Sequence, residues 1–212
     1  IVAARTEGSV NDESGITLFL VNSDSQGVEI TKTSMVDSRN AANIKFSDVT
    51  VSSDNILGEE NNGASLLEVV LDRAQIAISA EMLGNASQAF NLTLEYLKER
   101  KQFGAVIGTF QALQHRAAEM YSELELTKSS VIAACNAVDE NSNDLRRMAS
   151  LAKFKSGETN HLITNEAVQM HGGVGVTDEY DVGLFMKRAR VTEQIFGNSE
   201  YHIDRYATLS DY

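Results

Sequence analysis

The sequence predicts an α+β protein in which part of an antiparallel β-domain, residues 1–58, precedes an up-and-down helical bundle, residues 59–212. Two observations support this. Before residue 60, short runs of β-branched and aromatic residues alternate with Asn, Asp, Ser and Gly turns. After Gly63, apolar residues recur at spacings of three and four, the period of a helix with one buried face. A chain of 212 residues is long enough to bury a proper core.

The β-domain is predicted from runs at residues 16–21, 28–30 and 42–46, and residues 49–51 continue the same pattern. The chain begins with Ile1, inside a run that reads as a strand. We therefore expect the β-domain to be incomplete at its start, and the chain to be a fragment of a longer protein.

The bundle begins with a stripe formed by Leu83, Ala86, Phe90, Leu94 and Leu97. A similar stripe over residues 110–124 follows a break at residues 104–108. Further helices are expected at residues 145–168, 182–195 and 201–209, with an exposed polar loop at residues 139–144. Long helices joined by short turns predict a bundle.

Composition excludes several classes of function. A net charge of −12 disfavours binding to nucleic acid or to an anionic membrane, and no apolar run reaches the length of a membrane span. A single cysteine, Cys135, excludes a disulfide framework, and we expect it to be buried as a small apolar side chain. His115 and His161 have no partners at metal-ligand spacing, so no metal site is expected.

Residues 169–175, Gln-Met-His-Gly-Gly-Val-Gly, end one of the predicted helices. One glycine suffices to cap a helix, whereas three glycines in four positions remove the side chains that would keep a ligand away from the backbone. Gln169 adds an amide that both donates and accepts hydrogen bonds. The segment therefore predicts close approach of a ligand.

A second segment, residues 99–104, reads Glu-Arg-Lys-Gln-Phe-Gly and is followed by Thr-Phe-Gln at residues 109–111. Together with the glycine segment one helical hairpin later, it resembles the acyl-CoA dehydrogenase family. Residues 46–49 and 57–63 are similar to the end of that family's middle β-domain and its link into the bundle. The resemblance covers nearly the whole chain, in order.

The resemblance implies that an FAD lies at a subunit interface. Arg100 would pair with the FAD pyrophosphate, for which its planar, charge-assisted donors are suited. Further residues would contact the same cofactor: Gln102, Phe103, Gln169, Gly172, Gly173 and Asn198. The family also implies a homotetramer built as a dimer of dimers.

The family's usual positions for the catalytic base hold no acid in this chain. Carried over by position, Phe196 and Ala74 occupy the two usual seats, and Gln75 stands where an Arg commonly faces the acyl-CoA. A base must reach the proton that it removes, so its place is tightly constrained. We expect Gln75, Ile195 and Phe196 to face the substrate, and Glu193 is the candidate substitute base.

The resemblance implies an FAD-dependent dehydrogenase of lipid and fatty acid metabolism. It would form a 2,3-double bond in an acyl-CoA and transfer electrons to an electron-transfer flavoprotein. The missing acid leaves an alternative: a base-lacking partner subunit of a heteromeric acyl-CoA dehydrogenase, which completes the FAD site. A flavin oxidase or monooxygenase on the same fold is a remoter alternative. The expected compartment is the cytoplasm of a bacterium or, in a eukaryote, the mitochondrial matrix.

Overall fold

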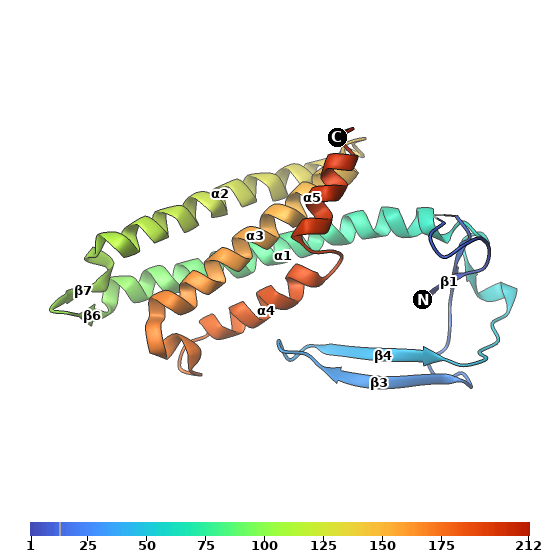
Figure 1. The fold of residues 1–212 in the computed structure, drawn as a ribbon, viewed down its shortest axis with the longest axis horizontal. Coiled ribbons are helices and arrows are strands. Elements are labelled where there is room, and N and C mark those ends of the chain that lie inside the picture. The colour runs from blue at the N-terminus through green and yellow to red at the C-terminus, as the bar shows by residue number, and fades with distance from the viewer. Residues whose placement is uncertain (13) are drawn as a thin grey trace. The chain divides into compact units, whose positions relative to one another are not determined.

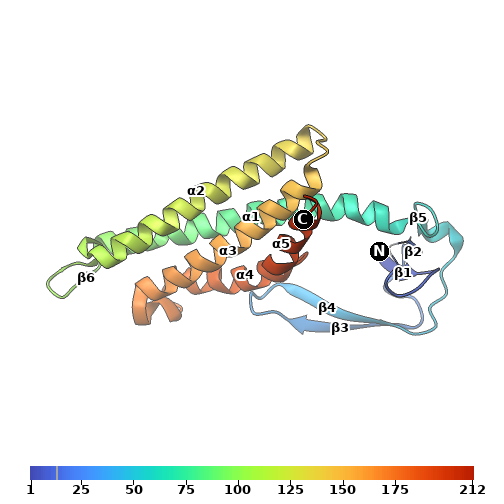
Figure 2. The same cartoon turned by 45° about the horizontal axis from the view of Figure 1, so that its top comes forward.

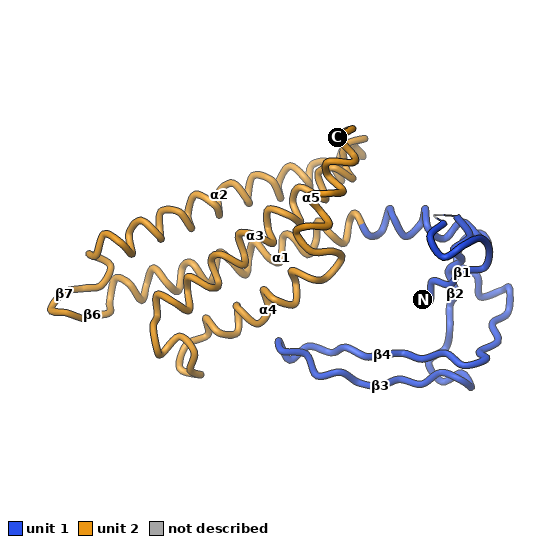
Figure 3. Tube along the Cα trace, viewed as in Figure 1, with its two compact units in different colours: residues 1–71 blue, residues 72–212 orange. Residues whose placement is uncertain are grey.

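The computed structural model describes residues 1–12 and 14–212 (Figure 1). The chain divides into two compact units, Ile1–Leu71 and Asp72–Tyr212, and the long first helix passes from one into the other (Figure 3). The domain boundary expected from the sequence, between residues 58 and 59, stays a prediction.

Unit 1 contains two small antiparallel sheets. The first has the order β1 (Val2–Arg5), β2 (Ile16–Phe19), β5 (Ile56–Leu57), with a short 3-10 turn, η1 (Ser53–Asn55), before its last strand. The second is a hairpin of β3 (Val28–Ser34) and β4 (Asn40–Phe46), in which Ile30 pairs with Ile44. Both of these isoleucines are exposed in the described structure. The hairpin is therefore held by its ladder and not by a core of its own.

The prediction of a strand at residues 49–51 is wrong. No ladder includes these residues in the part of the chain that the structure describes, and Ser52 instead caps η1 through its side chain. A β-branched run favours extended backbone, but a strand also needs a partner, and pairing is not encoded locally. The strands predicted over residues 16–21, 28–30 and 42–46 are confirmed with shifted ends.

Unit 2 is a helical bundle (Figures 1 and 2). Its helices are α1 (Gly63–Glu99, of which residues 72–99 belong to this unit), α2 (Gln111–Asp139), α3 (Leu145–His171), α4 (Val182–Gln194) and α5 (Ser199–Thr208). A tight hairpin, β6 (Lys101–Gln102) and β7 (Ala105–Val106), and a 3-10 turn, η2 (Ile107–Thr109), join α1 to α2. Another, η3 (Gly172–Val176), follows α3. The predicted helices and the exposed loop at residues 139–144 are confirmed.

Helix α3 is central, because it packs against α2, α4 and α5. Its inward face carries fully buried small residues such as Ala149, Ala152 and Ala167, which allow neighbouring helices to approach closely. Phe90 of α1 and Met120 of α2 meet this face in the larger core cluster. The expected burial of Cys135 is wrong: it lies on the exposed face of α2. Periodicity assigns a helix but does not fix the extent of its buried stripe.

Candidate functional site

The β6–β7 hairpin turns through only two residues, Phe103 and Gly104, with φ of +55° and +78°. Two-residue hairpin loops favour such turns, since their twist matches that of the strands, but a bulky residue with positive φ is unusual. Phe103 is also 93% exposed. A strained backbone that presents an exposed aromatic ring is the kind of outlier found at binding surfaces.

The glycines that follow α3 have different physical reasons to be glycine. Gly172 has φ +65° and ψ −144°, a conformation that side chains rarely adopt, and a Cβ on Gly175 would lie 2.7 Å from the Val168 oxygen. Gly173 has neither constraint, because a Cβ there would meet nothing within 4 Å. Folding therefore explains Gly172 and Gly175 but not Gly173, whose contact with a ligand stays a prediction.

The two segments meet at one shallow cavity of about 340 Å³. Six of the seven residues predicted to contact FAD line it, and they come from chain segments about one helical hairpin apart: Arg100, Gln102, Phe103, Gln169, Gly172 and Gly173. The seventh, Asn198, lies elsewhere, where its side chain accepts a hydrogen bond from the Tyr201 amide (3.0 Å) and caps α5. Their contacts with FAD stay predictions.

His171 forms the inner wall of this cavity. Its Nδ1 donates to the Ala167 oxygen (2.7 Å), and its ring stacks on Tyr96 with ring centroids 4.3 Å apart. Burial lowers the pKa of His171, although the bond to Ala167 opposes the shift, so the ring is neutral at physiological pH. Its buried Nε2 is then an acceptor with no partner in the described structure.

The cavity suits a dinucleotide flavin. Arg100 is exposed, and its guanidinium makes no hydrogen bond or ion pair within the described residues, so it is available to a pyrophosphate. Gln169 is exposed beside it, the backbone at Gly173 is open, and His171 Nε2 offers an unused acceptor. The guanidinium of Arg100, the amide of Gln169 and the open backbone at Gly173 are groups that fit FAD.

The turn between α4 and α5 carries the residue at the predicted seat of the base. Phe196 and Gly197 have φ of +60° and +103°, and Phe196 is 42% exposed. His202 Nε2 donates to the Phe196 oxygen (2.9 Å), while Lys153 Nζ donates to the oxygens of Glu193 (3.1 Å) and Gly197 (2.8 Å). The substrate-facing roles of Ile195 and Phe196 stay predictions.

The two residues that donate to this turn, Lys153 of α3 and His202 of α5, both have pKa values displaced from their ordinary values. Burial lowers the pKa of Lys153 from 10.5 to about 8, against a smaller opposing effect of Glu193. Burial also lowers the pKa of His202 to about 4, opposed by the bond to Phe196. Neither residue was identified from the sequence, although a cation among the small, buried residues of α3 is a signal that could have revealed Lys153.

The substitute base Glu193 is half-buried, and its carboxylate lies 3.4 Å from His161 Nδ1 and 3.5 Å from Arg190. Ala74 is half-buried on α1. Gln75 is 5% exposed, and its Oε1 accepts a hydrogen bond from Arg205 (3.2 Å). The structure thus places Gln75 in a buried network, and its contact with the substrate stays a prediction.

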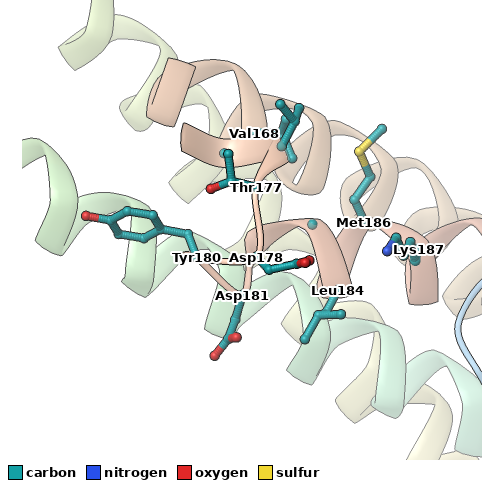
Figure 4. A pocket seen from close by; sticks show the side chains of 11 residues that line it. Val168, Thr177, Asp178, Tyr180, Asp181, Leu184, Met186 and Lys187 are labelled. Carbon is teal, nitrogen blue, oxygen red and sulfur yellow. The ribbon is translucent and has the colours of Figure 1, made fainter. Parts of the chain in front are cut away.

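A separate cavity of about 300 Å³ lies between η3 and the start of α4 (Figure 4). Val168, Leu184 and Met186 line it together with Asp178 and Lys187, and none of the predicted site residues belongs to it. Across residues 1–12 and 14–212, no group of three or more His, Cys, Asp or Glu side chains could hold a metal ion. None of the described helices is long and apolar enough to cross a membrane.

Comparison with known proteins identifies the family. The family described as "Acyl-CoA dehydrogenase, C-terminal domain" matches residues 61–208. The mitochondrial short/branched chain specific acyl-CoA dehydrogenase of Bos taurus is 33% identical over 196 residues, covering 91% of this chain and 45% of that protein. A probable acyl-CoA dehydrogenase of Bacillus subtilis, YngJ, is 34% identical over 203 residues, covering 94% of this chain and 53% of that protein.

Solved structures agree with the sequence relatives. Butyryl-CoA dehydrogenase from Megasphaera elsdenii superposes with a TM-score of 0.91 at 28% identity, covering 99% of this chain and 55% of that one. An acyl-CoA dehydrogenase from Geobacillus kaustophilus gives 0.94 at 28% identity, covering 100% and 57%. The chain spans about half the length of these relatives. Its motifs, its α+β fold and these matches agree, and the chain belongs to the acyl-CoA dehydrogenase family.

Proposed function

We propose that this chain is the C-terminal part of an FAD-dependent acyl-CoA dehydrogenase, which forms a 2,3-double bond in an acyl-CoA. The observation that carries the proposal is the single cavity shared by Arg100 and the Gly172–Gly173 backbone. Relatives whose names specify acyl-CoA dehydrogenases support the reaction class. A solved structure of a related fold, described as PigA with FAD and proline, supports the cofactor.

The chain's own residues would hold the flavin in distinct ways. Arg100 would neutralise the pyrophosphate, and Gln102 and Phe103 would lie beside the cofactor. The Gly172–Gly173 backbone would approach it closely, with Gln169 beside that backbone and Asn198 at a further contact. When bound, FAD supplies the acceptor for the two electrons that leave the acyl chain.

The site is proposed to be shared between subunits. The Phe103 ring is 93% exposed at the tip of the hairpin, and a neighbouring subunit that carries its own FAD would cover it. We propose a homotetramer arranged as a dimer of dimers, with residues 1–58 as part of the middle β-domain and residues 59–212 as the oligomerising bundle.

Electron-transfer flavoprotein is the proposed electron acceptor. One relative, 34% identical over 203 residues, is the CarC subunit of a caffeyl-CoA reductase–Etf complex from Acetobacterium woodii. Acidic surface is consistent with a protein partner and not with nucleic acid. The proposed setting is fatty acid metabolism, in the cytoplasm of a bacterium or the mitochondrial matrix of a eukaryote.

The substrate end is proposed to involve Ile195, Phe196 and Gln75, with Glu193 as the substitute base. Phe196 and Ala74 cannot remove a proton. The alternative to an active dehydrogenase is therefore a base-lacking partner subunit, and the experiment must distinguish the two. One solved structure, 25% identical to this chain, is described as the ChsE4-ChsE5 complex of Mycobacterium tuberculosis, so the family includes assemblies of two different named chains.

The test is anaerobic titration of the purified, flavin-loaded protein with short, branched and steroid-type acyl-CoAs. The proposal expects at least one of them to bleach the flavin absorption band. Bound flavin that no acyl-CoA bleaches, with bleaching restored only by a co-expressed relative carrying an acid at the position of Phe196, would establish the partner-subunit role instead.

A further inference from the structure

The turn between α4 and α5 is held from inside the bundle by two buried side chains from other parts of the chain. Lys153 on α3 is 2% exposed, and its Nζ donates to the oxygens of Glu193 and Gly197. His202 on α5 is fully buried and donates to the oxygen of Phe196. Three carbonyl groups within five residues are thereby fixed by side chains.

This turn needs such support, since its backbone is strained. Phe196 is a non-glycine residue with φ +60°, a conformation that persists only where the surroundings hold it. A side chain at Gly197 would be strained, because its φ is +103° and a Cβ there would lie 2.4 Å from Tyr201 Cδ1 and 3.0 Å from His202 Nε2. The turn is therefore packed tightly against the first turn of α5.

Packing between α3 and α5 reinforces the same region. A Cβ on Gly157 would lie 3.0 Å from Ser199 Oγ, so the absence of a side chain on α3 lets the start of α5 sit close. Lys153 reaches past this contact to the end of α4, where unsatisfied helix carbonyls carry partial negative charge. The amine there satisfies the Glu193 carbonyl at the end of α4 and the Gly197 carbonyl of the turn that follows.

Burial of an ammonium group is unfavourable unless it is well hydrogen-bonded. The buried ammonium of Lys153 makes two hydrogen bonds to this turn, which points to a specific role there. The consequence is seen at the surface. The backbone of Phe196 is held by the buried donor His202, while the residue as a whole is 42% exposed. Residue 196 therefore projects from a rigid seat, as a residue that meets a ligand must.

We propose that Lys153 is a positioning residue that, together with His202, fixes the α4–α5 turn so that the side chain at position 196 projects toward the acyl-CoA. This inference rests on the proposed function for the nature of the ligand. The rigidity of the turn itself does not depend on any ligand.

The first test reads the turn directly. The chain contains no tryptophan, so Phe196→Trp places a single fluorophore at the turn. Adding Lys153→Met removes both hydrogen bonds of Lys153 at similar side-chain length. We expect quenching of this Trp by acrylamide to increase at least about twofold, with a fall in anisotropy. Lys155→Met is the matched control, because Lys155 lies on the same helix but contacts Glu123 on α2. Equal quenching in the Lys153 and Lys155 variants would overturn the proposal.

The second test separates positioning from cofactor binding. Lys153 does not line the cavity that holds Arg100, so Lys153→Met should leave the flavin content unchanged. It should raise the KM for the acyl-CoA that bleaches the wild-type protein by roughly tenfold, since misplaced contacts weaken productive binding. An unchanged KM, with flavin and bleaching intact, would reject the positioning role and leave the proposed function standing.

The converse result is also informative. If the wild-type protein binds neither flavin nor acyl-CoA, the proposed function is rejected. If Lys153→Met still increases the quenching of the Trp in Phe196→Trp, the inference that Lys153 holds the turn stands. Should Lys153→Met fail to fold, Lys153→Gln takes its place, because its shorter side chain keeps a donor at this buried position but cannot reach both oxygens. Quenching of the Trp in Phe196→Trp should then be higher in this variant than in the Lys155→Gln control. Equal quenching in these two variants would overturn the inference.

Discussion

Lys153 Nζ lies 2.8 Å from the backbone oxygen of Gly197, although 44 residues separate them in the chain. This contact ties the middle of α3 to the turn at the predicted seat of the base, and it places an amine where water is nearly excluded. The pKa of Lys153 is accordingly lowered to about 8. A measurable dependence of stability on pH follows.

We expect the Lys153→Met variant to lose a rise in stability that the wild-type protein shows between about pH 8 and pH 10.5. In this window the unfolded chain binds a proton on Lys153 that the folded chain does not, so the free energy of unfolding increases with pH. The difference between the two proteins should change by about 3 kcal/mol, measured by urea unfolding. Curves that stay parallel across this window would show that Lys153 titrates normally.

Acid should destabilise the bundle through His202. Its pKa is lowered from 6.5 to about 4 by burial, so between these values only the unfolded chain is protonated and stability falls as pH falls. At pH 5 we expect a loss of about 2 kcal/mol relative to pH 7, which His202→Gln should remove. The exposed His115→Gln is the control. If the His202→Gln and His115→Gln variants lost the same free energy of unfolding between pH 7 and pH 5, the acid sensitivity could not be assigned to His202.

The pair of Arg205 and Asp72 should dominate the docking of α5. Arg205 Nη2 lies 2.6 Å from Asp72 Oδ1, and both side chains are largely buried. Asp72→Asn leaves the guanidinium without its counter-charge, so we expect a loss of about 3 kcal/mol in urea unfolding. The exposed pair of Asp144 and Arg147 provides the comparison, where Asp144→Asn should cost less than about 1 kcal/mol. Equal costs would mean that the buried pair is not a determinant of stability.

Phe196→Glu should install a base at the predicted seat. The turn already holds residue 196 with its side chain projecting outward, so the carboxylate would take the place of the ring. Anaerobic stopped-flow should show flavin bleaching by an acyl-CoA at least about a hundredfold faster than in wild type, the usual gain from general base catalysis. Phe196→Gln matches its shape without its basicity. If Glu and Gln variants react alike, position 196 is not the seat of the base.

Periodicity predicted the five helices, and the resemblance to the acyl-CoA dehydrogenase family implied that residues 99–104 and 169–175 belong to one site. Residues 49–51 were mispredicted, since pairing decides a strand and composition alone does not. The left-handed turns at Phe103 and Phe196 could not be predicted either, because neither residue favours positive φ and the rest of the fold imposes it.

The buried polar contacts escaped prediction for a related reason. Gln75 and Arg205 lie 130 residues apart, and no local signal joins them. Lys153 was detectable only as a charge on the buried stripe of α3, and its acceptors are backbone atoms that any sequence would supply. Contacts of this kind become visible only when the helices are placed side by side.

The amount of FAD that the Arg100→Ala variant retains tests the cofactor site most directly. Arg100 is exposed at the cavity that also contains Gln169 and the Gly172–Gly173 backbone, whereas the exposed Lys98 is not among its lining residues. Loss of a charge-assisted contact with pyrophosphate should reduce the bound FAD per chain by about tenfold or more, with Lys98→Ala unchanged. Equal flavin content in wild type, Arg100→Ala and Lys98→Ala, measured by absorbance after gel filtration, would contradict the account.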